Sequence, residues 1–136
     1  MENLETGLAL PELPGCGAIM KLGNSVSALA CLPWLRSARI LYWGDLDTHG
    51  LAILNRARQA LGDVTSVMMD EGTLLSHRPL WVEETTPHAQ DSWHRLTPIE
   101  HALFDKLCGN EWGVRVRLEQ ERIPWADAMT NLMAAL

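Results

Sequence analysis

Two aspartates, Asp45 and Asp47, are separated by one residue and follow a short apolar run and a glycine, Gly44. That run, residues 39–43, is bulky on both faces, which is typical of a strand in the middle of a parallel sheet. Ligands of open α/β sheets bind just beyond the carboxyl ends of such strands. Mg²⁺ is bound by one or two carboxylates together with water and phosphate oxygens. The aspartate pair therefore predicts a site for Mg²⁺, with Mn²⁺ as a substitute.

The residues after the pair fit a ligand that carries phosphate. Gly50 would let a phosphate approach the backbone closely, since it has no side chain, and His49 could touch a phosphate or a water molecule. A plainer interpretation stays open at this stage. Asp47 or Thr48 could simply cap the next helix, with His49 as a surface residue at its start.

The surrounding sequence predicts the elements that position the pair. Short apolar runs alternate with longer segments of helical spacing, which is the pattern of β–α–β units in an α/β fold with a mostly parallel sheet. We expect the sheet to include residues 17–22, 39–44 and 64–69. We expect helices over residues 26–32, 51–61, 73–82, 97–108 and 125–136, a loop over 83–96, and either strand or helix over 114–123.

Local signals mark the ends of several of these helices. Ser25 is a candidate cap for the first helix, which Pro33 interrupts, and Gly62 closes the second. Thr73 is a candidate cap for the third helix. The segment Thr97–Glu100 has the form of a capping box with proline at the first helical position.

Length and charge limit the classes of function. A chain of 136 residues is one domain, or one small domain with an appendage. We expect an α/β core over residues 1–82 and a mostly helical extension over 83–136. The net charge of −6, from 11 basic and 17 acidic residues, disfavours unaided binding to nucleic acid. A bound divalent cation would reverse the field locally.

The sequence also indicates a cellular compartment. No apolar run reaches the roughly 18 residues of a membrane-spanning helix, and the acidic start is unlike a secretory signal. Three cysteines without a Cys-x-x-Cys pair fit a reducing environment. We therefore expect a cytoplasmic protein that makes no membrane contact.

The segment Tyr42–Arg56 resembles the second motif of the Toprim fold, in which a glutamate ends the first strand and Asp-x-Asp ends a later one. More narrowly, the chain resembles the carboxyl-terminal domain family of JetD, the nuclease subunit of Wadjet anti-plasmid defence systems. The resemblance spans nearly the whole chain. Its other segments are Glu2–Thr6, Leu32–Leu35, Met69–Glu71 and Arg117–Pro124.

The resemblance implies a Toprim-like, Rossmann-like α/β fold related to the DNA-cleaving subunit of topoisomerase VI, and Mg²⁺-dependent cleavage of DNA. An SMC-type ATPase complex would present and bend the DNA, and a homodimer would suit a cut through both strands. Glu2 matches the Toprim glutamate, a general acid/base and metal contact, while Asp45 and Asp47 match the metal-binding pair. The candidates for a second metal are Glu5, Glu119 and Glu121.

The family pattern also sets expectations for Glu2 and for the chemistry. A strand normally precedes the glutamate, but only Met1 precedes Glu2 here, so we expect a missing first strand and a loosely held Glu2. Tyr42 lies within a strand and is expected to be packed, which favours hydrolysis by an activated water over tyrosyl transfer. Lys21 and Arg78, near strand ends, would neutralise the phosphate, or each could be an ordinary surface charge.

Three other classes of protein are alternatives to a nuclease. A phosphatase of the haloacid dehalogenase type expects Thr or Val where His49 stands, and it also needs a later lysine and paired acids. A response-regulator receiver needs acids after its first strand and a lysine after its last. A non-catalytic interaction module, or an inactive fragment of a nuclease, agrees with the acidic balance and stays open.

Overall fold

The computed structural model describes residues 1–89 and 93–136 of the chain. Within these described residues, five α-helices and four two-residue strands alternate, with 3₁₀ helices between them, so the predicted α/β class is confirmed in its coarse form. The α-helices are α1 (Leu4–Leu8), α2 (Thr48–Leu61), α3 (Glu71–Ser76), α4 (Pro98–Cys108) and α5 (Trp125–Ala135). The strands are β1 (Leu41–Tyr42), β2 (Thr65–Ser66), β3 (Val82–Glu83) and β4 (Val116–Arg117). The 3₁₀ helices are η1 (Gly23–Cys31), η2 (Pro33–Ser37), η3 (Arg78–Leu80) and η4 (Gln120–Arg122).

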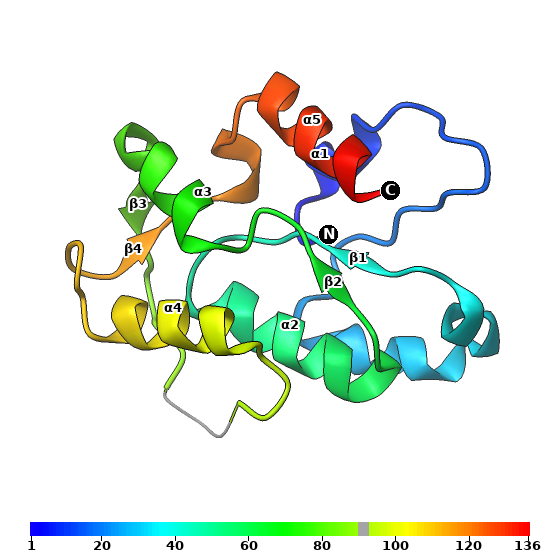
Figure 1. Cartoon of the computed structure of the whole chain (residues 1–136), viewed down its shortest axis with the longest axis horizontal. Helices are drawn as coiled ribbons and strands as arrows, with labels where there is room; N and C mark the ends of the chain where they lie inside the picture. Colours follow the sequence, from blue (N-terminus) through cyan, green and yellow to red (C-terminus); the bar gives the residue numbers. More distant parts are fainter. Residues whose placement is uncertain (90–92) are drawn as a thin grey trace.

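The strands form two small sheets. β1 and β2 are parallel, with Leu41 opposite Thr65, and helix α2 crosses between them as the predicted β–α–β unit. β3 and β4 are antiparallel, with Val82 opposite Arg117. Figure 1 shows β1 and β2 lying between α2 on one side and α1 with α5 on the other. The pairing of β3 with β4 joins the two expected parts of the chain, 1–82 and 83–136.

The core is built around the β1–α2–β2 unit. Trp43 and Leu46, which follow β1, are almost fully buried, as are Leu51 and Leu54 on the inner face of α2. Phe104 of α4 belongs to the same apolar cluster. Burial of this apolar surface fixes the turn between β1 and α2, where the two aspartates lie.

The expected strand over residues 17–22 does not form. Lys21 has a φ of 58°, which lies in the left-handed region and interrupts an extended run. Residues 17 and 18 are exposed, the Ile19 carbonyl accepts a hydrogen bond from the Met1 ammonium, and the Leu22 carbonyl accepts one from the Ser25 backbone. An apolar run without a neighbouring strand has no ladder to join.

Two predicted helices take other forms. Residues 23–31 wind into the 3₁₀ helix η1, which Leu22 precedes without a side-chain cap, so Ser25 is not the cap. Pro33 ends this segment as expected, because η2 begins there. The helix expected over 73–82 is the short α3, which Asp70 caps instead of Thr73. Pro79 lies in η3 after it, and the chain then enters β3.

The last third matches the sequence more closely. Thr97 and Glu100 form the predicted capping box at the start of α4, and α5 begins directly after Pro124. The ambiguous segment 114–123 contains both β4 and η4. The expected loop over 83–96 begins with the last residue of β3, and its residues 90–92 lie outside the described part of the chain. Among the described residues, no helix is long and apolar enough to cross a membrane.

Candidate functional site

The turn between β1 and α2 is held against the segment that follows β4. Leu46 and Leu118 exchange backbone hydrogen bonds of 2.9 and 3.2 Å, which form an isolated antiparallel bridge. Both side chains are buried. This bridge places Asp45 and Asp47 beside Arg117 and Gln120, which lie 70 or more residues later in the chain.

Arg117 lies between the two aspartates. Its Nη2 is 2.5 Å from Oδ2 of Asp45, and its Nε is 3.3 Å from Oδ2 of Asp47. The other oxygen of each aspartate accepts a backbone hydrogen bond, from Gln120 at 2.8 Å and from Gly50 at 2.7 Å. The bond from Gly50 makes Asp47 the N-cap of α2. The plainer capping role is therefore real, but it uses one oxygen of Asp47 only.

Glu2 is tied into the same turn. Its Oε2 accepts hydrogen bonds from the Asp45 backbone at 2.9 Å and from the Tyr42 hydroxyl at 3.3 Å. The backbone N–H groups of Glu2 and Asn3 both donate to Oε1 of Gln120 at 3.3 Å. The expectation of a loosely held Glu2 was wrong, because the β1–α2 turn binds its carboxylate and Gln120 binds its backbone. Tyr42 is buried, as expected of a packing residue.

Two glycines make room for this arrangement. A Cβ on Gly44 would overlap the Glu2 carboxylate and the Tyr42 hydroxyl. A Cβ on Gly50 would overlap the Asp45 carbonyl oxygen. The sequence suggested that Gly50 admits a phosphate; in the structure its missing side chain admits the backbone of Asp45.

Burial changes the acidity of this cluster. It raises the pKa of the Glu2 carboxyl, and the Asp45 charge raises it further. Burial is also the main reason that the pKa of Asp47 rises to about 7, with the charges of Glu84 and Asp45 adding to it. The Gly50 N–H and the Arg117 guanidinium act in the opposite direction on Asp47. Both groups can therefore exchange protons closer to neutral pH than ordinary carboxyls do.

Comparison with protein families decides where the chain belongs. The family described as Wadjet protein JetD, C-terminal, matches residues 1–132. The chain belongs to this JetD family. The suspected relationship is thus confirmed, and membership associates the chain with Wadjet, a multi-subunit defence system. Comparison with curated proteins gives no match.

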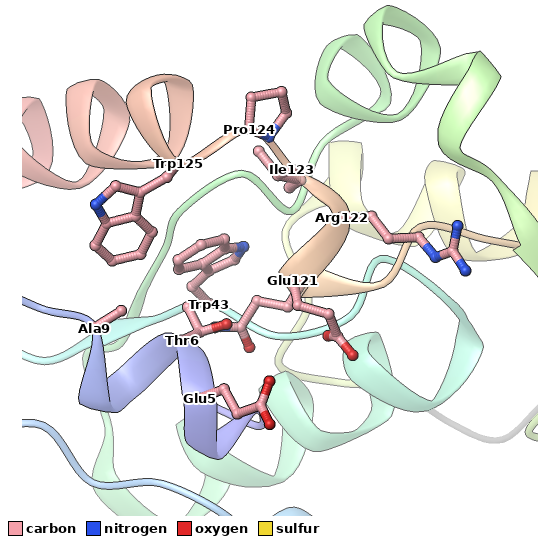
Figure 2. A pocket seen from close by; sticks show the side chains of 10 residues that line it. Glu5, Thr6, Ala9, Trp43, Glu121, Arg122, Ile123, Pro124 and Trp125 are labelled. Carbon is pink, nitrogen blue, oxygen red and sulfur yellow. The ribbon is translucent and has the colours of Figure 1, made fainter.

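The other acidic candidates have surroundings of their own. Glu119 is paired with Arg122 at 2.7 Å and approaches Arg117 at 3.7 Å. Glu5 and Glu121 line a pocket of about 380 Å³ between α1, η4 and the start of α5. Figure 2 shows Glu5 extending from α1, with the rings of Trp43 and Trp125 on another side of the pocket. A second-metal role for the three remains a prediction.

The predicted phosphate contacts are dispersed. His49 Nε2 lies 2.6 Å from the Thr86 carbonyl oxygen. The Arg78 guanidinium lies over the Trp81 ring, 5.3 Å from its centroid, and Lys21 is exposed. Across residues 1–89 and 93–136, no hydrogen bond or ion pair joins these three side chains to the aspartate pair.

Three residues of this cluster had no role predicted from the sequence. Arg117 and Gln120 fall within a segment that carries the family resemblance, so a signal existed, but nothing in it indicated their roles. Glu84 is 2% exposed and accepts hydrogen bonds from the Thr48 hydroxyl at 2.7 Å and the His49 backbone at 3.3 Å. It fell inside the predicted loop and had no signal of its own.

The donors present suit a hard divalent cation in their chemistry. Glu2, Asp45 and Asp47 offer carboxylate oxygens, the ligands that Mg²⁺ and Mn²⁺ prefer, and a positive group already bridges the two aspartates. In the described part of the chain, however, no three His, Cys, Asp or Glu side chains are grouped to hold an ion. The three carboxylates do not face one another, because Glu2 binds the backbone N–H of Asp45 and the Arg117 guanidinium lies between the two aspartates.

The raised pKa of Asp47 predicts a pH-dependent stability difference. Its ordinary value is 3.8, and in the folded chain it is about 7. The folded state therefore holds a proton that the unfolded state has lost, and stability falls as the pH rises from about 4 to 7. Asp47→Asn, which keeps an oxygen for the Gly50 N–H, removes this decline.

Urea unfolding at pH 5 and pH 8 measures this effect. The stability of Asp47→Asn relative to the unaltered chain is expected to increase between these values by roughly 2 to 3 kcal/mol. Asp63→Asn, on the exposed turn after α2, is the control and is expected to follow the unaltered chain. A difference for Asp47→Asn that is the same at both pH values would contradict the raised pKa.

Proposed function

We propose that the chain is the Toprim-like domain of a DNA endonuclease that depends on Mg²⁺ and hydrolyses the phosphodiester backbone. In this proposal residues 1–82 form the Toprim-like core, and 83–136 form an extension packed on it. The observation that carries it is the position of the acids just beyond β1, where Glu2 binds the backbone of Asp45 and one guanidinium bridges Asp45 and Asp47. Family membership supports the setting in a Wadjet complex.

Each carboxylate has a separate part in this proposal. Asp45 and Asp47 would hold the cation, which when bound supplies charge to polarise the phosphate and to activate water. Glu2, buried and with a raised pKa, would accept a proton from the attacking water or deliver one to the leaving 3′ oxygen. Tyr42 is occupied by hydrogen bonds to Glu2 and to the Gly50 carbonyl. That arrangement favours water over tyrosine as the nucleophile.

The proposed function requires DNA and partner proteins. The chain is acidic overall, so its own surface offers little attraction for DNA. An SMC-type ATPase complex would therefore present and bend the plasmid DNA. A homodimer would supply two sites, one for each strand.

Calorimetric titration of Mn²⁺ and Mg²⁺ into the purified chain tests this function first. We expect one cation site, and Asp45→Asn and Asp47→Asn are each expected to weaken it at least about tenfold. Asp63→Asn is the matched control because its side chain lies on an exposed turn. Circular dichroism of each variant confirms that the fold is intact.

Two outcomes would count against the function. Binding that both aspartate variants leave unchanged would place the cation elsewhere. A folded chain that binds neither ion at millimolar concentration would favour the alternative of a non-catalytic interaction module. The present grouping of the acids, with Glu2 turned to the backbone, is the observation on which that alternative rests.

A further inference from the structure

Arg117 holds the position between Asp45 and Asp47 that the proposed function gives to a cation. Its guanidinium faces both carboxylates, and its side chain is 29% exposed, so it lies at the surface of the cluster. The pair needs a positive partner because two carboxylates this close repel each other. The structure satisfies that need with a side chain of its own.

The contact with Asp47 is imperfect. Nε of Arg117 is buried and has no hydrogen-bond partner, although the Asp47 oxygen is 3.3 Å away. An unpaired buried donor is costly. The guanidinium also has a second acceptor within reach, since Nη2 is 3.7 Å from Oε1 of Glu119. Of the contacts with the two aspartates, only the one between Nη2 and Asp45 is short, so release of the pair means breaking that one close contact.

The backbone around Arg117 is fixed, so only the side chain needs to move. β4 pairs with β3, and the Leu46–Leu118 bridge follows immediately. Glu119 already binds Arg122 through its other carboxylate oxygen. Displacement of the Arg117 guanidinium toward Glu119 would place it beside Arg122, on the same carboxylate.

We propose that Arg117 is an exchangeable internal cation, which gives up Asp45 and Asp47 to a divalent ion and then binds a phosphate oxygen of the DNA. The inference rests on the proposed function and adds a residue to it. A planar guanidinium suits this second role because its fork of donors matches the oxygens of a phosphate. Arg117 would thus neutralise the cluster before substrate arrives and neutralise the substrate afterwards.

The test measures Mn²⁺ affinity and DNA cleavage in the same variants. Arg117→Gln removes the competing charge, so Mn²⁺ is expected to bind the full chain about tenfold more tightly in calorimetry. Cleavage of plasmid DNA by the assembled complex is expected to fall by roughly 100-fold. A residue that only stabilises the fold would not move these two quantities in opposite directions.

Two further variants keep the test decisive. Arg117→Lys retains the charge without the fork of donors, so its Mn²⁺ affinity is expected to stay near that of the unaltered chain while cleavage falls. It also serves if Arg117→Gln does not fold. Arg115→Gln is the matched control: Arg115 lies two residues earlier and pairs with Glu83 on the exposed side of β3 and β4. It is expected to change neither quantity.

The possible results distinguish a failure of the role proposed for Arg117 from a failure of the proposed nuclease function. Unchanged or weaker Mn²⁺ binding by Arg117→Gln overturns the exchange, and tighter binding with undiminished cleavage overturns the phosphate contact. If the unaltered chain binds no Mn²⁺ and the complex carrying Asp45→Asn cleaves normally, the proposed function itself has failed, and the role of Arg117 fails with it.

Discussion

Exchange of Glu2 for glutamine is expected to lower DNA cleavage by roughly 100- to 10,000-fold, the usual contribution of a general acid or base. Glutamine keeps an oxygen that can accept from the Asp45 backbone and the Tyr42 hydroxyl, so the turn should keep its shape. What it loses is the ability to exchange a proton, for which burial raises the pKa of Glu2 above its ordinary value. Plasmid cleavage by the assembled complex measures the loss.

Controls separate chemistry from folding in this experiment. Unfolding in urea should show Glu2→Gln to be about as stable as the unaltered chain. Glu12→Gln, at an exposed position beyond α1, should cleave DNA normally. Full activity of Glu2→Gln in a complex that loses activity with Asp45→Asn would remove Glu2 from the mechanism and leave the aspartates in it.

Replacement of Gly50 by alanine is expected to destabilise the chain by about 3 kcal/mol, although alanine is normally the better residue within a helix. The added Cβ would overlap the Asp45 carbonyl oxygen and would lie 3.4 Å from Oε2 of Glu2. The obstacle is backbone at the buried start of α2, which cannot rotate away as a long side chain can. Urea unfolding followed by circular dichroism measures the loss.

Gly17→Ala provides the comparison for this substitution. A Cβ at Gly17 meets nothing within 4 Å, so its stability should change by no more than about 0.5 kcal/mol. Because Asp45 lies directly behind Gly50, the Gly50 variant should also bind Mn²⁺ more weakly. Equal stability of the two alanine variants would show that α2 does not begin as close to Asp45 as the structure has it.

Both substitutions, at Glu2 and at Gly50, test how the turn between β1 and α2 is built. Gly50 fixes the backbone of the aspartate turn, while Glu2 supplies a group that the turn holds. The buried Glu84, which directly follows β3, accepts hydrogen bonds from Thr48 and His49 at the start of α2 and supports the same turn. A site assembled on the first turn of a helix in this way is held by buried contacts and not by an exposed loop.

Features that depend on neighbouring residues could be predicted from the amino-acid sequence alone. The apolar run before Asp45 predicted β1, the spacing after it predicted α2, and the Thr97–Glu100 box predicted the start of α4. Caps, turns and helical faces are set by contacts across three or four residues, so a local pattern is enough to find them. The same patterns, read with the family resemblance, brought Glu2 and the aspartate pair forward as candidates.

Which side chains meet beside the two aspartates became known from the tertiary structure and not from the sequence. Nothing in the sequence pairs Val82 with Arg117 or Leu46 with Leu118, because such partners are chosen by long-range burial of apolar surface and by backbone pairing. These pairings bring Arg117 between two aspartates about 70 residues away. They also bring Glu84 to the start of α2, where it accepts a hydrogen bond from Thr48. The strand expected over 17–22 failed for the same reason: an apolar run becomes a strand only where the fold provides a neighbour to pair with.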